Sequence, residues 1–218
     1  MSWDRVTPQL LSATVDTLYM VGAATAVTVL LGVPLGVLLV VTARDGLVPR
    51  ALLNRVLGAV VNLGRSLPFI ILLVAVAPVT RWVVGTTIGA TATIVPLTLG
   101  AVPFLARLVE TSLREVAPGK VEAALAMGAR HRDVVRTVLL PEALPSVVAG
   151  VTVTVVALVS YSAMAGAVGG GGLGDFAIRY GYQQFRTDIT VATVVVLIAV
   201  VQLLQVAGVS LARRLAQR

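Results

Sequence analysis

The stretch VEAALAMGARHRDVVRTVLLPEALPSV, residues 121–147, is a charged, helix-patterned segment in a 218-residue chain of which only 12% is charged. Small and apolar side chains recur in it at three- and four-residue spacing on both sides of Gly128. Pro118 suits the first turn of a helix that ends at this glycine. We therefore expect two short amphipathic helices joined at Gly128, with Pro141 and Pro145 bracketing the approach to an apolar run. The segment is too short for a domain, which suggests that it contacts another molecule.

The composition outside this segment is that of a membrane protein. The chain is 57% hydrophobic with a mean hydropathy of +0.96, more apolar side chain than a soluble domain of this length can bury. The absence of cysteine excludes disulfides, thiolate nucleophiles and Cys-ligated metals. The net charge of +7 comes from basic residues between apolar runs, which indicates membrane topology rather than a nucleic-acid partner.

Charged residues delimit five long apolar stretches, and each is long enough for the roughly 20 residues that a helix needs to cross a bilayer. Only one of the five contains an internal charge, Arg65. The sequence thus predicts an all-α integral membrane protein, a single transmembrane domain over residues 1–218. The predicted spans are about 17–42, 56–79, 87–106, 146–168 and 189–211.

Lysine and arginine are distributed unequally between the two sides of such a five-span chain. One side carries twelve of them, and the positive-inside rule makes this side cytoplasmic. The N-terminus is then expected outside, and the C-terminus and the segment 107–145 inside. The twelve are Arg44, Arg50, Arg55, Arg107, Arg114, Lys120, Arg130, Arg132, Arg136, Arg213, Arg214 and Arg218; the four on the other side are Arg5, Arg81, Arg179 and Arg186.

Several features of the predicted spans have two interpretations. The glycines and prolines that interrupt the first three spans either line a pathway or reflect the ordinary content of membrane helices; they are Gly32, Pro34, Gly36, Pro68, Pro78, Pro96, Gly100 and Pro103. The run GGGGLG, residues 169–174, lacks the Lys–Ser/Thr ending of a Walker A loop, so it is either a flexible turn or a pliable outer mouth. Arg65, near the inner end of the second span, is expected to snorkel to the interface or to pair with an acid.

The predicted spans contain no group of residues arranged for catalysis or metal binding. His131 is the only histidine and has no ligand-spaced neighbours, and paired acids or a Ser–Lys dyad are absent from the spans. We therefore expect no metal, no cofactor in this chain and no enzyme activity of its own. Ser160, Tyr161 and Met164 are the polar and polarizable part of the fourth span, where helix packing and pathway lining are both plausible roles.

The charged segment resembles the EAA signature of ATP-binding-cassette importer permeases, with Val where the signature usually has Ile. The matching residues, with their fixed spacing, are Glu122, Ala123, Ala124, Gly128, Val138, Leu140 and Pro141. The resemblance implies that residues 118–141 form a cytoplasmic coupling segment, which sits in a cleft of a separate ATPase subunit. Glu122 and arginines such as Arg132 would then pair or cap within this loop and its partner.

Three further stretches, 65–89, 94–110 and 158–182, together with the charged segment 121–147, are similar to the methionine-importer permeases of that family. The resemblance implies the type I importer fold in a bacterial inner membrane, as a homodimer with two ATPase subunits that bind ATP and Mg²⁺. It also implies an external methionine-binding lipoprotein and places Met164 at the gate, with Tyr161 and Ser160 along the pathway. A permease for another amino acid, a phosphonate or a betaine is the alternative; a channel would leave the EAA spacing unexplained.

Overall fold

The computed structural model describes residues 3–217 of the chain. Residues 1, 2 and 218 lie outside the described residues, and so does the side chain of Arg5. Arg5 and Arg218 of the charge count above are therefore not placed. Residues 3–217 contain helices and no strand, which confirms the predicted all-α class.

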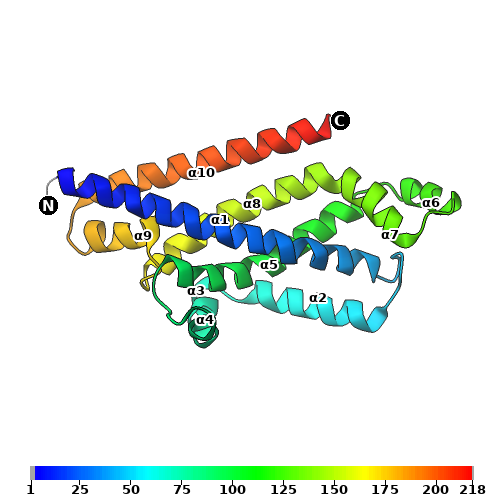
Figure 1. The fold of residues 1–218 in the computed structure, drawn as a ribbon, viewed down its shortest axis with the longest axis horizontal. Coiled ribbons are helices and arrows are strands. Elements are labelled where there is room, and N and C mark those ends of the chain that lie inside the picture. The colour runs from blue at the N-terminus through cyan, green and yellow to red at the C-terminus, as the bar shows by residue number, and fades with distance from the viewer. Residues whose placement is uncertain (1–2, 218) are drawn as a thin grey trace.

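Four long helices run beside one another along the long axis of the molecule (Figure 1). They are α1 (Trp3–Val41), α5 (Ala90–Arg114), α8 (Leu140–Gly166) and α10 (Thr187–Ala216). The shorter elements are α2 (Ala51–Ser66), α3 (Phe69–Ala75), α4 (Ala77–Val84), α6 (Pro118–Ala126), α7 (His131–Val134), the π-turn η1 (Val135–Leu139), α9 (Gly172–Phe176) and the π-turn η2 (Ala177–Tyr182). The N-terminus lies at one end of the long axis, and the C-terminus points toward the end that carries α6 and α7.

Within residues 3–217, four helices are long and apolar enough to cross a membrane, and α2 with α3 makes a fifth candidate if the bent pair is one span. The helices extend beyond the predicted spans, since α1 already begins at Trp3 and α10 continues to Ala216. A helix does not have to end where the hydrocarbon ends, because water satisfies the outer turns as well. Charge positions thus mark where a span must lie, and they do not mark helix ends.

The second predicted span, 56–79, is wrong as a continuous helix. The chain bends by 106° between α2 and α3, at Leu67 and Pro68. Pro68 has no N–H to donate to the preceding turn, and its ring disfavours helical geometry at Leu67, which is extended with φ −84° and ψ 127°. The break therefore follows from one residue that the charge pattern ignores.

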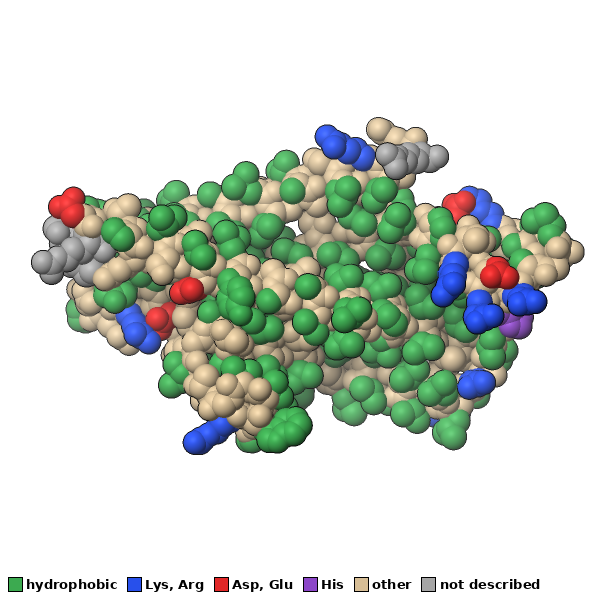
Figure 2. All heavy atoms as spheres, viewed as in Figure 1, with side chains coloured by type: hydrophobic (Ala, Val, Ile, Leu, Met, Phe, Trp, Pro, Cys, Tyr) green, Lys and Arg blue, Asp and Glu red, His purple; other side chains and the backbone are tan. Residues whose placement is uncertain are grey.

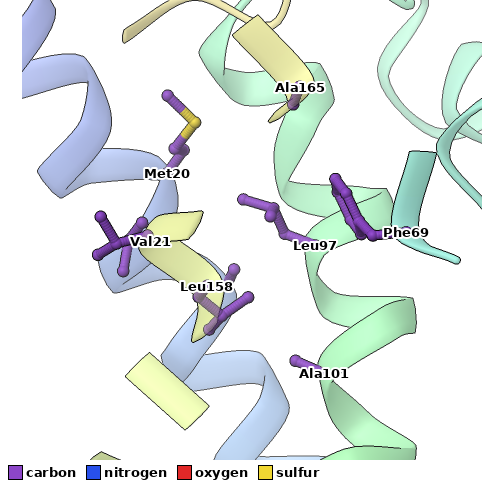
Figure 3. Packing of buried hydrophobic residues seen from close by; sticks show 9 residues of the cluster. Met20, Val21, Phe69, Leu97, Ala101, Leu158 and Ala165 are labelled. Carbon is purple, nitrogen blue, oxygen red and sulfur yellow. The ribbon is translucent and has the colours of Figure 1, made fainter. Parts of the chain in front are cut away.

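Helices α1 and α5 approach closely because α1 has glycine where they meet. A Cβ on Gly36 would lie 2.6 Å from Cβ of Val109 and 2.7 Å from the carbonyl oxygen of Ala106. Further along the pair, Met20 and Val21 of α1 pack with Leu97 and Ala101 of α5 and with Leu158 of α8 (Figure 3). Small residues at such contacts let helices associate where lipid offers no hydrophobic gain. Gly36 thus serves helix packing in this chain.

The glycine run after α8 is a turn packed against neighbouring elements. A Cβ on Gly170 would come 2.8 Å from the carbonyl oxygen of Ala165, and one on Gly172 would come 2.5 Å from Cε of Met20. The Gly89 N–H donates to the Gly169 carbonyl at 2.9 Å, and the Leu173 N–H donates to Oγ1 of Thr17 at 2.8 Å. These bonds fasten the turn to the starts of α5 and α9 and to α1.

We expect Gly36→Ala to destabilise the protein by about 1–3 kcal/mol, since the added methyl overpacks the α1–α5 contact. Gly22→Ala in the same helix is the matched control, because a Cβ there meets nothing within 4 Å. That control should be neutral or stabilising by up to about 1 kcal/mol. Thermal melting of the detergent-solubilised variants measures the difference, and equal melting temperatures would refute this account of the contact.

Candidate functional site

Helix α6 and Gly128 form the first half of the segment 118–141, which resembles the EAA signature. Pro118 occupies the first turn of α6, and Gly128 follows the helix with φ +84°, in the left-handed region. The Ala129 N–H donates to the Ala124 carbonyl at 3.1 Å, and the Gly128 N–H donates to the Leu125 carbonyl at 2.9 Å. This pair of bonds is a Schellman motif, which needs a residue tolerant of positive φ. The predicted helix joint at Gly128 is confirmed, and its backbone geometry explains why glycine stands there.

The second half of the segment is not a separate short helix, contrary to the expectation from Pro141 and Pro145. The helical path from His131 continues without interruption to Gly166 over 36 residues. Just before Pro141 the chain makes the π-turn η1, in which the Leu140 N–H donates to the carbonyl of Val135. A wider turn of this kind relieves the clash that a proline ring causes one turn earlier. The segment therefore joins the membrane helix α8 directly.

Two contacts hold α6 against the start of this long helix. Nζ of Lys120 lies 2.6 Å from Oε2 of Glu142 in α8. Val121 packs against a buried cluster that includes Leu113 and Leu139. Beside these contacts α6 borders a hollow of about 400 Å³, whose lining includes Glu122 and His131 together with Asp45, Arg114 and Leu125.

The signature residues divide between surface and packing. Glu122, Ala123, Gly128, Arg132 and Pro141 are exposed. Ala124 is only 8% exposed, and Leu140 is half-buried. In this chain taken alone, Glu122 and Arg132 therefore lie on a surface, as a docking element requires.

A charge cluster on α5, which precedes this segment, was not among the sequence predictions. Glu110 of α5 is 7% exposed, and its carboxylate pairs with Nη1 of Arg107 at 2.6 Å and with Nη2 of Arg114 at 3.2 Å. Arg114 also reaches Asp45 in the α1–α2 loop at 3.5 Å, and Arg107 donates to Oδ1 of Asn62 in α2 at 2.6 Å. The Arg–Glu–Arg spacing of three and four residues could have revealed it. The cluster ties α5 to α2 and to the loop before α2.

The three expected pathway residues lie near the end of α8 but do not converge on one cavity of this chain. Met164 is 48% exposed, and Ser160, one turn earlier, lines a hollow between α8 and α10. The ring of Tyr161 is half-buried and stacks on Phe69 of α3, with centroids 4.6 Å apart and planes within 5°. Tyr161 thus faces the α2–α3 bend, whereas Ser160 faces α10.

Arg65 lies one residue before the end of α2, and its side chain is exposed. Its expected position near the inner end of a span stays a prediction. Among residues 3–217 no ion pair or side-chain hydrogen bond involves Arg65, so the expected pairing with an acid is not found within the chain.

Comparison with known proteins gives the family. The model of the family "binding-protein-dependent transport system inner membrane component" matches residues 29–218. The probable D-methionine transport system permease protein MetI of Vibrio cholerae is 58% identical over 209 residues, covering 96% of this chain and 93% of the relative. The methionine import system permease protein MetP of Bacillus subtilis is 42% identical over 200 residues, covering 92% and 90%.

Solved structures agree with this. A chain of the MetNI methionine ABC transporter, in its inward-facing conformation, superimposes with a TM-score of 0.95 at 46% identity over 99% of both chains. A chain of an amino acid ABC transporter solved with histidines has a TM-score of 0.80 at 18% identity over 96% of this chain and 95% of that one, and this likeness shows the fold alone. The resemblance to type I importer permeases is therefore confirmed. The chain belongs to the family of inner membrane components of binding-protein-dependent transport systems, and it is a transport permease rather than an enzyme.

Proposed function

We propose that this chain is the permease subunit of an ATP-driven importer that carries methionine across the cytoplasmic membrane by alternating access. The observation that carries the proposal is the 58% identity, over nearly the full chain, to a relative described as a probable D-methionine permease. Family membership supplies the import of a solute delivered by a binding protein. The identity of the solute rests on the relatives.

The proposed assembly is a homodimer of this chain with two ATPase subunits and an extracytoplasmic methionine-binding lipoprotein. ATP and Mg²⁺ would bind the ATPases, and this chain would supply no cofactor site. The likeness to a chain of the MetNI methionine ABC transporter supports an ATPase partner. The family description supports the binding protein. The many exposed apolar side chains of α10 suit lipid or a second copy of the chain.

The proposed orientation puts the N-terminus outside and the C-terminus in the cytoplasm. On the face shown in Figure 2, charged side chains gather toward the two ends of the molecule, and a broad apolar region separates them. The end with α6 and α7 carries most of the basic side chains visible there. The positive-inside rule favours this end as the cytoplasmic one.

The mechanism follows from the continuity of the coupling segment with α8. ATP binding would close the two ATPases, and α6 would move with the cleft that holds it through Glu122, Ala123, Gly128 and Arg132. The Lys120–Glu142 ion pair and the Val121 packing pass this motion to the start of α8. Since residues 131–166 are one helix, the displacement reaches Ser160, Tyr161 and Met164 without crossing a loop. We assign Met164 to the gate and the other two to its pathway.

Reconstitution tests the solute. Proteoliposomes with this permease, its ATPase and the binding protein should accumulate methionine only when ATP is supplied. Uptake of a phosphonate or a betaine in place of methionine would reassign the solute. Uptake without ATP would show a channel and reject the importer.

Gly128→Val should weaken the ATPase complex, whereas Gly128→Asn should preserve it. Both side chains enter open space, since a Cβ on Gly128 meets nothing within 4 Å, so the two variants differ in backbone preference. Left-handed geometry costs roughly 1–2 kcal/mol for most residues and less for Asn. About 1.4 kcal/mol is tenfold in affinity, so co-purification and uptake at limiting ATPase should fall by about tenfold for Val only. Equal behaviour of the two variants would contradict the role of the Schellman turn.

Orientation can be tested because the natural chain has no cysteine. Arg81→Cys should react with a membrane-impermeant thiol reagent added outside intact cells, and Arg132→Cys should react only after the cells are opened. The pair is matched, since both arginines are exposed in the folded chain. External labelling of Arg132→Cys would invert the topology.

A further inference from the structure

Arg65 occupies a position where an unpaired charge is costly. It is the one charge inside the five predicted apolar stretches, ten residues beyond Arg55 on α2, and its side chain is exposed in this chain. Charged side chains within membrane-spanning segments are rare and mark solute pathways or paired networks. Because no partner within residues 3–217 neutralises Arg65, a group from outside the chain is the remaining counter-charge.

Arg65 lines a cavity at the α2–α3 bend. The cavity measures about 220 Å³, room for about seven waters at roughly 30 Å³ each. That is the scale of a small organic solute. Its lining is one cation, one tyrosine and an otherwise apolar wall, and it includes Leu72, Gly100, Phe104, Phe69 and Tyr161. No acidic residue contributes to it.

Two stacked aromatic rings form part of the cavity wall. Phe69 is 7% exposed and stacks face to face with Tyr161 of α8. In Figure 3 its ring lies between α3 and α5, on the opposite side of α5 from Met20. Gly100 of α5 contributes no side chain, and a Cβ there would lie 3.2 Å from Cδ2 of Leu72. The bend at Pro68 and this glycine together leave the space open.

We propose that this cavity is a transient subsite of the translocation pathway for amino acids with apolar side chains. Arg65 receives the solute's carboxylate, and Phe69, Phe104 and Leu72 contact its side chain. A guanidinium matches a carboxylate in a two-bond fork. The lining contains no acidic residue to bind the ammonium group of the solute. Binding through the carboxylate alone is therefore weak, as a transient site in a translocation pathway requires. The proposal rests on the proposed function, because it presumes that an amino acid crosses this chain.

The subsite also touches the proposed gate helix. Tyr161 lies one turn before Met164 on α8 and forms part of the cavity wall through its stack on Phe69. Displacement of α8 therefore changes the cavity that holds the solute. A displacement of α8 would therefore move Met164 and weaken solute binding in the subsite at the same time.

The test uses Arg65→Cys in the complete transporter reconstituted with its ATPase and binding protein. Loss of a charge-assisted bond should lower the maximal methionine uptake rate by about tenfold or more. The KM should stay near the wild-type value, because the binding protein sets it. Modification with an aminoethyl methanethiosulfonate should restore uptake, and the sulfonatoethyl reagent should not. Methionine should also slow the aminoethyl labelling. Arg81→Cys, treated identically, is the control.

The outcomes separate the two claims. Absence of methionine uptake by the wild-type transporter rejects the proposed function. Wild-type uptake with Arg65→Cys equal to Arg81→Cys overturns the subsite alone, and so does restoration by the sulfonate reagent. If Arg65→Cys does not assemble, Gly100→Val narrows the cavity while keeping the charge. That variant should lower the maximal uptake rate of methionine with its KM unchanged, and a maximal rate equal to the wild-type value overturns the subsite.

Discussion

A backbone amide inside a bilayer has no water to bond, so every peptide group there must find its partner within the protein. This constraint accounts for the all-helical chain and for where its irregular backbone lies. Two departures from helix are the α2–α3 bend and the glycine turn after α8. The turn lies against α1 and the start of α5, where Thr17 and Gly89 satisfy two of its backbone groups. The irregular backbone of the glycine turn is thus satisfied by other parts of the protein.

The same constraint makes close contact between helices the main source of specificity. Lipid is as apolar as leucine, so apolar side chains gain little by leaving it, and van der Waals contact decides which helices pair. Gly36 brings α1 against Val109 of α5, and Gly172 admits Met20 at the glycine turn. The glycines of this chain are therefore concentrated where backbones meet. Arg107, Glu110 and Arg114 form one charge cluster, whereas Arg65 has no ion-pair partner among residues 3–217.

The spacing of charges was sufficient to predict the class and the approximate location of the spans, because a bilayer demands a minimum apolar length. It could not predict the break at Pro68, since many membrane helices tolerate proline when neighbours compensate. At the coupling segment, the glycine joint was predictable from helical periodicity around Gly128. The continuity of residues 131–166 was not predictable, because a π-turn changes the backbone hydrogen-bond register without changing the hydrophobic pattern of the sequence. The cluster at Glu110 was predictable from the three- and four-residue spacing of Arg107, Glu110 and Arg114, which places the three side chains on one face of a helix.

The π-turn at residues 135–139 has a geometric consequence for the gate. One residue of a helix corresponds to a rotation of about 100° about the axis. A π-turn holds one residue more than an α-helical turn. Conversion between the two geometries would therefore rotate the part of α8 beyond the turn by about that angle, while the helix axis stays straight. Pro141 stands next to the turn and opposes the regular form. The direction in which Met164 points from the axis of α8, relative to α6, is therefore set by a single backbone irregularity some 25 residues away. If α8 rotates about its axis instead of bending, the rotation would occur at this turn.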